Sequence, residues 1–195
     1  MLSLKDSLAV LKKTNALLEG HFVLSSGLHS SKYVQCAKLL SYPHYSRNFC
    51  KSLSQKINKK FNNIDLILAP AMGGIVIGYE IGRLLKKETI FSERIEGKFQ
   101  LRRGFSIKKN SRVIIIEDVI TTGKSSLECA KLIAKSKAKL IGYASIIDRS
   151  NKKNLRIKKK IISHIKIDVP VFKKNKLPKY LKSRPISSPG SRFIR

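Results

Sequence analysis

Alternating apolar and polar segments dominate the pattern of the chain and predict a regular succession of strands and helices. Short apolar runs at 65–70 and 112–118 are typical of strands buried on both faces, and we expect further strands at 88–93, 140–148 and 164–171. Apolar residues at helical spacing predict helices over 2–18, 43–61, 75–85 and 127–134. Because strands alternate with helices, we expect an α/β fold whose central sheet is mainly parallel and flanked by helices.

Two segments stand outside this alternation. Residues 21–35 predict two short strands around the turn Ser25-Ser26-Gly27. Residues 95–110 are polar, basic and glycine-containing, with few helical features, and predict a mobile loop or a hairpin. With no linker or internal repeat, the 195 residues predict a single domain, 1–195.

Composition limits the environment of the protein. No apolar run is long enough for a transmembrane helix, and the N-terminus lacks a signal-peptide core, so we expect no membrane association. The three cysteines, Cys36, Cys50 and Cys129, form no metal-binding or redox spacing. They predict reduced thiols in a cytoplasmic protein.

The net charge of +29 is concentrated towards the C-terminus, because 15 of the 41 Lys and Arg residues lie in 151–195, where Asp168 is the one acidic residue. A lysine-rich solvated surface is the favoured interpretation, and attraction of anionic substrates is an additional effect. Nucleic-acid binding is a third interpretation. It is disfavoured because the basic tail has few aromatic residues and no recognised binding motif.

The segment from Arg112 to Ser126 carries the clearest chemistry. A buried strand leads into Glu117 and Asp118, and a hydroxyl-rich turn then leads into a helix. Backbone N–H groups in such a turn, together with the helix N-terminus, bind phosphate. An ordinary connection capped by Thr or Ser would explain one hydroxyl but not two carboxylates. The carboxylates suit a pair of sugar hydroxyls, so the segment predicts a ribose 5-phosphate site.

A second loop after a buried strand has the sequence Pro70-Ala-Met-Gly-Gly74. Paired glycines allow backbone N–H groups to approach an anion closely. In a mainly parallel sheet, we expect ligands at the carboxyl ends of the strands, where this loop lies.

These motifs resemble the signature of type I phosphoribosyltransferases, which bind phosphoribosyl pyrophosphate (PRPP). The resemblance implies that family's fold, with a small hood formed largely by residues 1–40 and the C-terminal segment. Lys124 stands where the family often has a second glycine, so its side chain either points away or adds a cation near the phosphate. The resemblance assigns PRPP binding to Met72, Gly73, Gly74, Glu117, Asp118, Val119, Ile120, Thr121, Thr122, Gly123, Lys124 and Ser125.

The basic segment 92–105 resembles the catalytic loop of orotate phosphoribosyltransferases in their short bacterial form. A cationic loop that closes over the site would stabilise the departing pyrophosphate and exclude water. The resemblance implies a mobile loop at about 94–106 that reaches the neighbouring subunit of a homodimer. It assigns catalytic roles to Arg94 and Lys98, together with Asp118, and leaves the roles of Arg102 and Arg103 open.

Base recognition is predicted from three places. Ser26, Gly27 and Tyr33 lie in an N-terminal segment that resembles the same enzymes, and Tyr33 offers a ring for stacking. Thr121 matches a family position that contacts orotate. Arg149 follows the 140–148 strand, where its guanidinium could bind a carboxylate through two hydrogen bonds. Orotate carries such a carboxylate, whereas uracil, adenine and hypoxanthine do not.

The C-terminal segment 185–192 also resembles the family's ending.

The resemblance therefore implies transfer of phosphoribose from PRPP to orotate, in the synthesis of pyrimidine nucleotides. It implies Mg²⁺ as the cofactor, held mainly by PRPP and water rather than by protein ligands. Two alternatives remain open. One is a phosphoribosyltransferase for another base, and the other is a PRPP-sensing regulator that binds nucleic acid through its basic surface.

Overall fold

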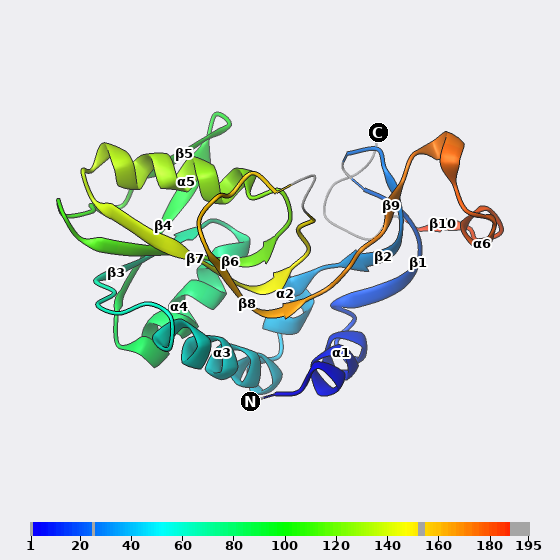
Figure 1. Cartoon of the computed structure of the whole chain (residues 1–195), viewed down its shortest axis with the longest axis horizontal. Helices are drawn as coiled ribbons and strands as arrows, with labels where there is room; N and C mark the ends of the chain where they lie inside the picture. Colours follow the sequence, from blue (N-terminus) through cyan, green and yellow to red (C-terminus); the bar gives the residue numbers. More distant parts are fainter. Residues whose placement is uncertain (1, 25, 152–154, 188–195) are drawn as a thin grey trace.

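A computed structural model describes residues 2–24, 26–151 and 155–187. The chain forms a central sheet of six strands in the order β5-β4-β3-β6-β7-β8 (Figure 1). Every neighbouring pair is parallel except β4 and β5, which form an antiparallel hairpin. The strands are β3 (Leu66–Pro70), β4 (Glu88–Ile95), β5 (Lys98–Leu101), β6 (Arg112–Ile120), β7 (Lys139–Asp148) and β8 (Ile161–Lys166).

Helices cover both faces of this sheet, as Figure 1 shows. On one face lie α3 (Pro43–Asn58) and α4 (Gly73–Leu85), with the short α2 (Cys36–Leu40) beside them. On the other lies α5 (Lys124–Lys135). Along β6 the fully buried side chains alternate, since Ile114 and Ile116 pack with α3 and α4, and Val113 and Ile115 with α5. This two-sided burial explains the unbroken apolar run and confirms the predicted α/β fold.

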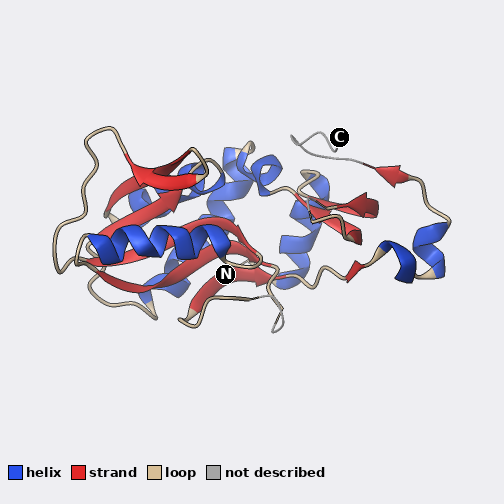
Figure 2. Ribbon diagram, turned by 90° about the horizontal axis from the view of Figure 1, so that it is seen from above, coloured by secondary structure: helices blue, strands red, loops and turns tan. Residues whose placement is uncertain are grey.

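A second, smaller sheet stands at one end of the molecule and forms the hood (Figure 2). Its order is β10-β1-β2-β9, so both ends of the chain contribute to it. Helix α1 packs beside β1, and a short helical segment, η1 and α6, connects β9 to β10. The elements are α1 (Leu4–Lys13), β1 (Leu17–Val23), β2 (His29–Val34), β9 (Val171–Phe172), η1 (Lys174–Lys176), α6 (Lys179–Lys182) and β10 (Ile186–Ser187).

Two predicted elements were wrong in their extent. The helix expected over 2–18 ends at Lys13, because Asn15 adopts a left-handed conformation (φ 55°) and the chain then enters β1. The strand expected over 164–171 is instead β8, which ends at Lys166. Pro170 lacks an N–H for a sheet ladder, and the residues after it join β2 in the hood.

Other boundaries differ by a few residues, and some of the differences matter for function. Helix α4 begins at Gly73 rather than at 75, and α5 begins at Lys124 rather than at 127. Both glycine-containing loops therefore run directly into a helix N-terminus. Segment 95–110 contains the turn and the second strand of the β4–β5 hairpin, whose first strand precedes it, so the hairpin expected there begins earlier in the chain. In the described part of the chain, no helix is long and apolar enough to cross a bilayer.

Candidate active site

The carboxyl ends of β3 and β6 bring the two predicted anion-binding segments together. These strands are parallel neighbours, and α4 starts immediately beyond β3. The backbone of Gly73 lies directly against Asp118, because a Cβ at this glycine would stand 2.8 Å from the Asp118 carboxylate. The glycine loop and the acidic pair thus form a single site at the carboxyl edge of the sheet.

The phosphate turn connects β6 to α5 with a specific geometry. Gly123 is the N-cap of α5 and has φ +73°, a conformation that favours glycine. A Cβ there would also meet the side chain of Ile157 at 2.5 Å. The N–H of Lys124 donates to the Thr122 hydroxyl at 3.3 Å, and Thr121 is exposed. The turn and the helix N-terminus can therefore present N–H groups to a phosphate.

Not all predicted residues of this segment offer a side chain to a ligand. Ile120 is 1% exposed and packs in the core, while its carbonyl accepts a hydrogen bond from the N–H of Arg149 at 2.8 Å. Val119 packs against the opposite core. Ser125 is half-buried in the first turn of α5, and Met72 is 81% exposed just before α4. Val119 and Ile120 therefore shape the site through the backbone.

The acidic pair lies in a poorly solvated environment. Burial raises the pKa of Glu117 to about 7, although a hydrogen bond from the Ser126 hydroxyl opposes this shift. Burial also raises the pKa of Asp118, opposed by the N–H of Val119, which donates to its Oδ1 at 2.8 Å. The two carboxylates keep acceptor oxygens for a ligand, and the hydroxyls of a ribose diol are suitable donors.

At the end of β7, Arg149 has an unusual environment. Its Nε is buried and has no hydrogen-bond partner among the described residues. Burial lowers the pKa of its guanidinium, and the electrostatic effect of the Tyr33 phenol opposes this shift. Tyr33 in turn packs against the ring of Phe22, with centroids 5.7 Å apart. A buried, unpaired donor costs free energy, so Arg149 is suited to receive an acceptor from a ligand.

The structure does not bring every predicted base contact together. Ser26 and Gly27 lie exposed in the turn between β1 and β2, where Gly27 has φ +76° and its N–H donates to the carbonyl of Leu24 at 2.8 Å. Within the described residues, no hydrogen bond joins this turn to Arg149. The expected C-terminal motif at 185–192 lies outside the described residues from 188 onwards.

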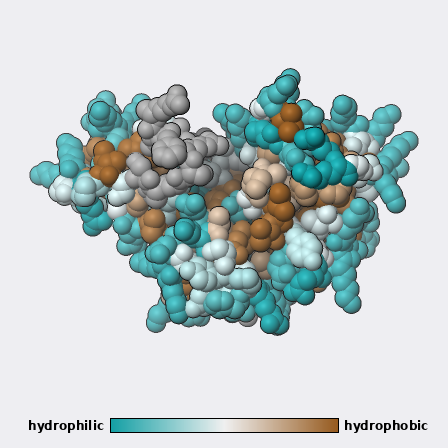
Figure 3. Space-filling view, turned by 180° about the vertical axis from the view of Figure 1, so that it is seen from behind, coloured by the Kyte–Doolittle hydropathy of each residue, from teal (hydrophilic) through white to brown (hydrophobic). Residues whose placement is uncertain are grey.

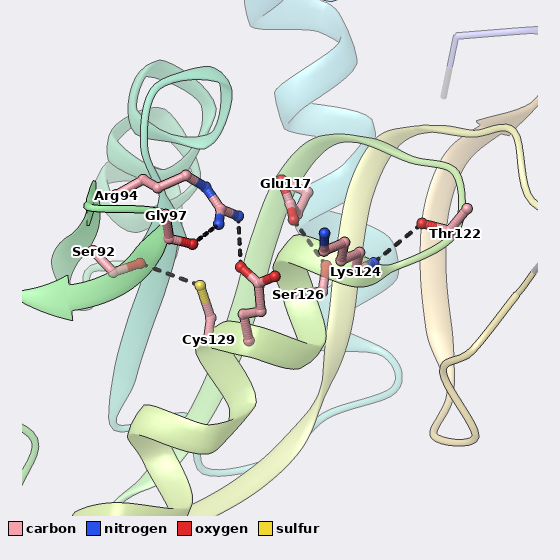
Figure 4. Close-up of polar contacts among 9 residues, drawn as sticks. Ser92, Arg94, Gly97, Glu117, Thr122, Lys124, Ser126 and Cys129 are labelled. Carbon is pink, nitrogen blue, oxygen red and sulfur yellow. Dashed lines mark hydrogen bonds and ion pairs between the residues drawn. The ribbon is translucent and has the colours of Figure 1, made fainter. Parts of the chain in front are cut away.

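The β4–β5 hairpin carries the predicted catalytic cations. Arg94 stacks on the ring of Phe99, with 4.2 Å from Cζ to the centroid, and donates to Glu128 on α5 at 2.5 Å (Figure 4). It also donates to the carbonyl of Gly97. Lys98 is exposed at the start of β5. In this state Arg94 is paired with α5, so its guanidinium is not free to contact a ligand.

Two further arginines, which directly follow β5, are also paired. Arg103 donates to Glu93 at 2.6 Å, and Arg102 lies 3.8 Å from the same carboxylate. Glu93 and Glu128 were not expected from the sequence as partners of these cations. For Arg102 and Arg103, the nearby Glu93 was a visible signal, whereas Glu128 approaches only through the fold.

A matched pair of variants tests how firmly the hairpin is held. The Arg94–Glu128 ion pair is partly exposed, and such a pair contributes about 0.2–1 kcal/mol. Glu128→Gln should therefore accelerate amide hydrogen exchange within 93–101 by up to about fivefold. Glu80→Gln, which removes the Arg83 pair on α4, should leave this exchange unchanged. Equal exchange in all three proteins would contradict the prediction.

The fold and the site define a class of protein, an α/β protein whose acidic pair and two glycine-containing turns at the carboxyl edge of the sheet are suited to a phosphorylated sugar. A family profile described as "Phosphoribosyl transferase domain" matches residues 46–181, more than half of the chain. An orotate phosphoribosyltransferase of Parvibaculum lavamentivorans is 45% identical over 184 residues, which cover 94% of each chain. The chain therefore belongs to the phosphoribosyltransferase family, as one of its orotate phosphoribosyltransferases.

Solved structures share the fold at lower identity. The orotate phosphoribosyltransferase of Aeropyrum pernix is 24% identical, with a TM-score of 0.71 over 82% of this chain and 92% of that one. The adenine phosphoribosyltransferase of Saccharomyces cerevisiae is 16% identical, with a TM-score of 0.64 over 81% of this chain and 99% of that one. Since enzymes for different bases share this fold, the fold alone does not identify the base.

Proposed function

We propose that this site transfers the 5-phosphoribosyl group of PRPP to orotate, giving orotidine 5′-monophosphate and pyrophosphate in the synthesis of pyrimidine nucleotides. The observation that carries the choice of base is the Arg149 guanidinium, whose Nε is buried without a partner among the described residues, while the backbone N–H of Arg149 donates to the carbonyl of Ile120 at the end of β6. Its guanidinium matches the carboxylate of orotate, which adenine and uracil lack. The 45% identity to the Parvibaculum orotate enzyme supports the same choice.

Each segment of the site has a role in the reaction. Glu117 and Asp118 accept hydrogen bonds from the ribose hydroxyls, and the turn from Thr121 to Ser125 holds the 5-phosphate. A ring nitrogen of orotate forms a bond to C1 of the ribose while the bond from C1 to pyrophosphate breaks. Orotate can supply this nitrogen already ionised, so the site needs no strong general base. Catalysis then rests on positioning and electrostatics.

The leaving pyrophosphate gains negative charge, and cations of the β4–β5 hairpin are placed to stabilise it. Arg94 would exchange its contact with Glu128 for the pyrophosphate, and Lys98 is already exposed. This exchange requires the hairpin and the following loop, about 94–106, to move. Closure of the loop would also keep water from the reactive ribose.

Magnesium is the cofactor that this chemistry favours. Within the described residues, no group of three His, Cys, Asp or Glu side chains is arranged to hold a metal. The proposal of Mg²⁺ rests instead on its chemistry, since this ion retains water and is usually bound through substrate phosphates with few protein ligands. When bound, Mg²⁺ neutralises charge on the pyrophosphate, and the ion would be held by PRPP oxygens and water.

A homodimer is the proposed assembly, with the hairpin reaching towards the neighbouring subunit. Met72, Val76 and Tyr79 are 81%, 54% and 68% exposed, and their spacing puts them on one face of α4. Figure 3 shows a face on which apolar side chains gather within a hydrophilic surface. Exposed apolar groups beside the glycine loop are suited to subunit contact. A dimer contact there would lie close to the active site.

The proposed location is the cytoplasm, with small-molecule substrates and no role for membranes or nucleic acid. Cys36, Cys50 and Cys129 are all buried and unpaired, as expected where thiols stay reduced. The high positive charge is then explained as a solvated surface that also attracts the polyanion PRPP.

The test of this function follows the ultraviolet absorbance of orotate after mixing the protein with PRPP and Mg²⁺. We expect orotate to be consumed, with pyrophosphate released in equal amount, and no reaction with uracil or adenine. Turnover of one of those bases in place of orotate would identify a phosphoribosyltransferase for another base. Tight, salt-sensitive binding to a specific DNA without pyrophosphate release would instead indicate a regulator.

A further inference from the structure

A buried hydrogen bond joins the two elements that flank the phosphate turn. The hydroxyl of Ser126, in the first turn of α5, donates to Oε1 of Glu117 on β6 at 2.9 Å (Figure 4). Ser126 is 0% exposed and Glu117 is 8% exposed. Ser126 lies too deep to contact a ligand directly, so its hydroxyl acts on the site through Glu117.

The charges around Glu117 make this contact significant. Asp118 is beside it on β6, and Cys129 approaches from α5 with its pKa raised by burial to about 12, so the thiol is neutral. On β7, the residue in register is the uncharged Ser145, and on α4 Gly73 faces Asp118. Among the described residues, no Lys or Arg forms an ion pair with Glu117. The hydroxyl of Ser126 is thus a major favourable contact of the carboxylate.

We propose that Ser126 is a positioning residue, whose hydroxyl keeps the Glu117 carboxylate ionised and oriented towards the ribose diol, and so sets the lower pH limit of PRPP binding. This inference rests on the proposed function of the site. An ionised carboxylate offers acceptors to both diol hydroxyls, whereas a protonated one has lost acceptor capacity. At low pH, binding of PRPP must therefore release the proton held by Glu117.

The direction of the pH effect follows from the environment of Glu117. Burial raises its pKa to about 7, and the Ser126 hydrogen bond lowers it, so that loss of the hydroxyl raises it further. PRPP binding should weaken as the pH falls through the pKa of Glu117. In Ser126→Ala this weakening should begin at higher pH.

The first measurement is the ¹³C NMR titration of the Glu117 side-chain carboxyl in the free protein. We expect a midpoint near pH 7 for the wild type. For Ser126→Ala we expect an increase of about one pH unit, as a lost charge-assisted hydrogen bond implies. Ser126→Cys keeps a weak donor and should fall between the two, which provides a second test if the alanine variant fails to fold. Ser30→Ala, which removes an equally buried hydroxyl bonded to the carbonyl of Pro170 in the hood, should leave the midpoint unchanged.

The second measurement is the Kd of PRPP from pH 6 to pH 9, by calorimetry. The ionisation of PRPP itself is the same for both proteins, so the ratio of the Kd values for Ser126→Ala and wild type reports on the protein. We expect a ratio within about twofold at pH 9 that rises towards about tenfold at pH 6.

The outcomes separate the inference from the proposed function. A ratio that is the same at every pH, or equal NMR midpoints for wild type and Ser126→Ala, would overturn the role of Ser126 while leaving PRPP binding intact. Failure of the wild type to bind PRPP at any pH would overturn the proposed function instead.

Discussion

Replacing Arg149 by alanine should reduce kcat/KM for orotate between about 30-fold and about 5,000-fold. The guanidinium is desolvated, and its Nε has no partner within the described structure. Loss of one partner from a buried, hydrogen-bonded charge pair costs about 2–5 kcal/mol, which corresponds to this range of rates. Steady-state kinetics with varied orotate at saturating PRPP would measure the change.

Three comparisons make the Arg149 prediction specific. The Kd of PRPP should stay within about twofold, because Arg149 serves the base rather than the sugar phosphate. Arg149→Lys keeps the charge but loses the planar fork, so its loss of activity should be smaller but still clear. The Tm of Arg149→Ala should be equal to or higher than that of the wild type, since the change removes an unpaired buried donor. Undiminished orotate turnover would remove Arg149 from base recognition.

Replacing Gly73 by alanine should weaken PRPP binding between about 10-fold and about 150-fold. The added Cβ would stand 2.8 Å from the Asp118 carboxylate and force it away from the ribose diol. A charge-assisted hydrogen bond of about 1.5–3 kcal/mol would then be lost, which gives the stated range. The fold should tolerate the change, because Gly73 is exposed and the displaced group is a side-chain end. Calorimetric titration with PRPP and a thermal melt would measure both effects.

A double-mutant cycle with Asp118→Ala provides the control. Asp118→Ala alone removes the atoms with which the new Cβ collides, and it should weaken PRPP binding to a similar extent. Adding Gly73→Ala to this variant should then cost little more, so the two effects are far from additive. Additive losses would mean that Gly73 acts on PRPP independently of Asp118, for example through its own N–H.

The sequence predicted those features that depend on short segments. The apolar run before Glu117 predicted a strand buried on both faces, and Val113 to Ile116 alternate between two cores as that requires. The glycine loop and the acidic pair were expected at one edge of the sheet, and Gly73 meets Asp118 there. Parallel pairing of successive strands is a general rule, so a local pattern sufficed for this part of the site.

The features that the sequence could not supply depend on contacts between distant segments. Nothing in the local pattern shows that Glu128 would bind Arg94, because that pair joins a hairpin to a helix. Hydrophobic periodicity alone could not predict the hood sheet either, because its strand β10 has two residues and pairs with β1 from the other end of the chain. The end of α1 was also not predicted, because it depends on the left-handed backbone conformation of one residue, Asn15.

The phosphate turn is supported from below by residues that are distant in the sequence. Ile157 occupies the space beside Gly123, and the N–H of Arg156 donates to the carbonyl of Thr122 at 3.1 Å. These residues belong to the connection between β7 and β8, which no phosphate-binding motif includes. Substitutions in that connection will therefore alter how the turn is supported. Relatives with the same phosphate-binding motif but a different β7–β8 connection should differ in their affinity for the sugar's terminal ester.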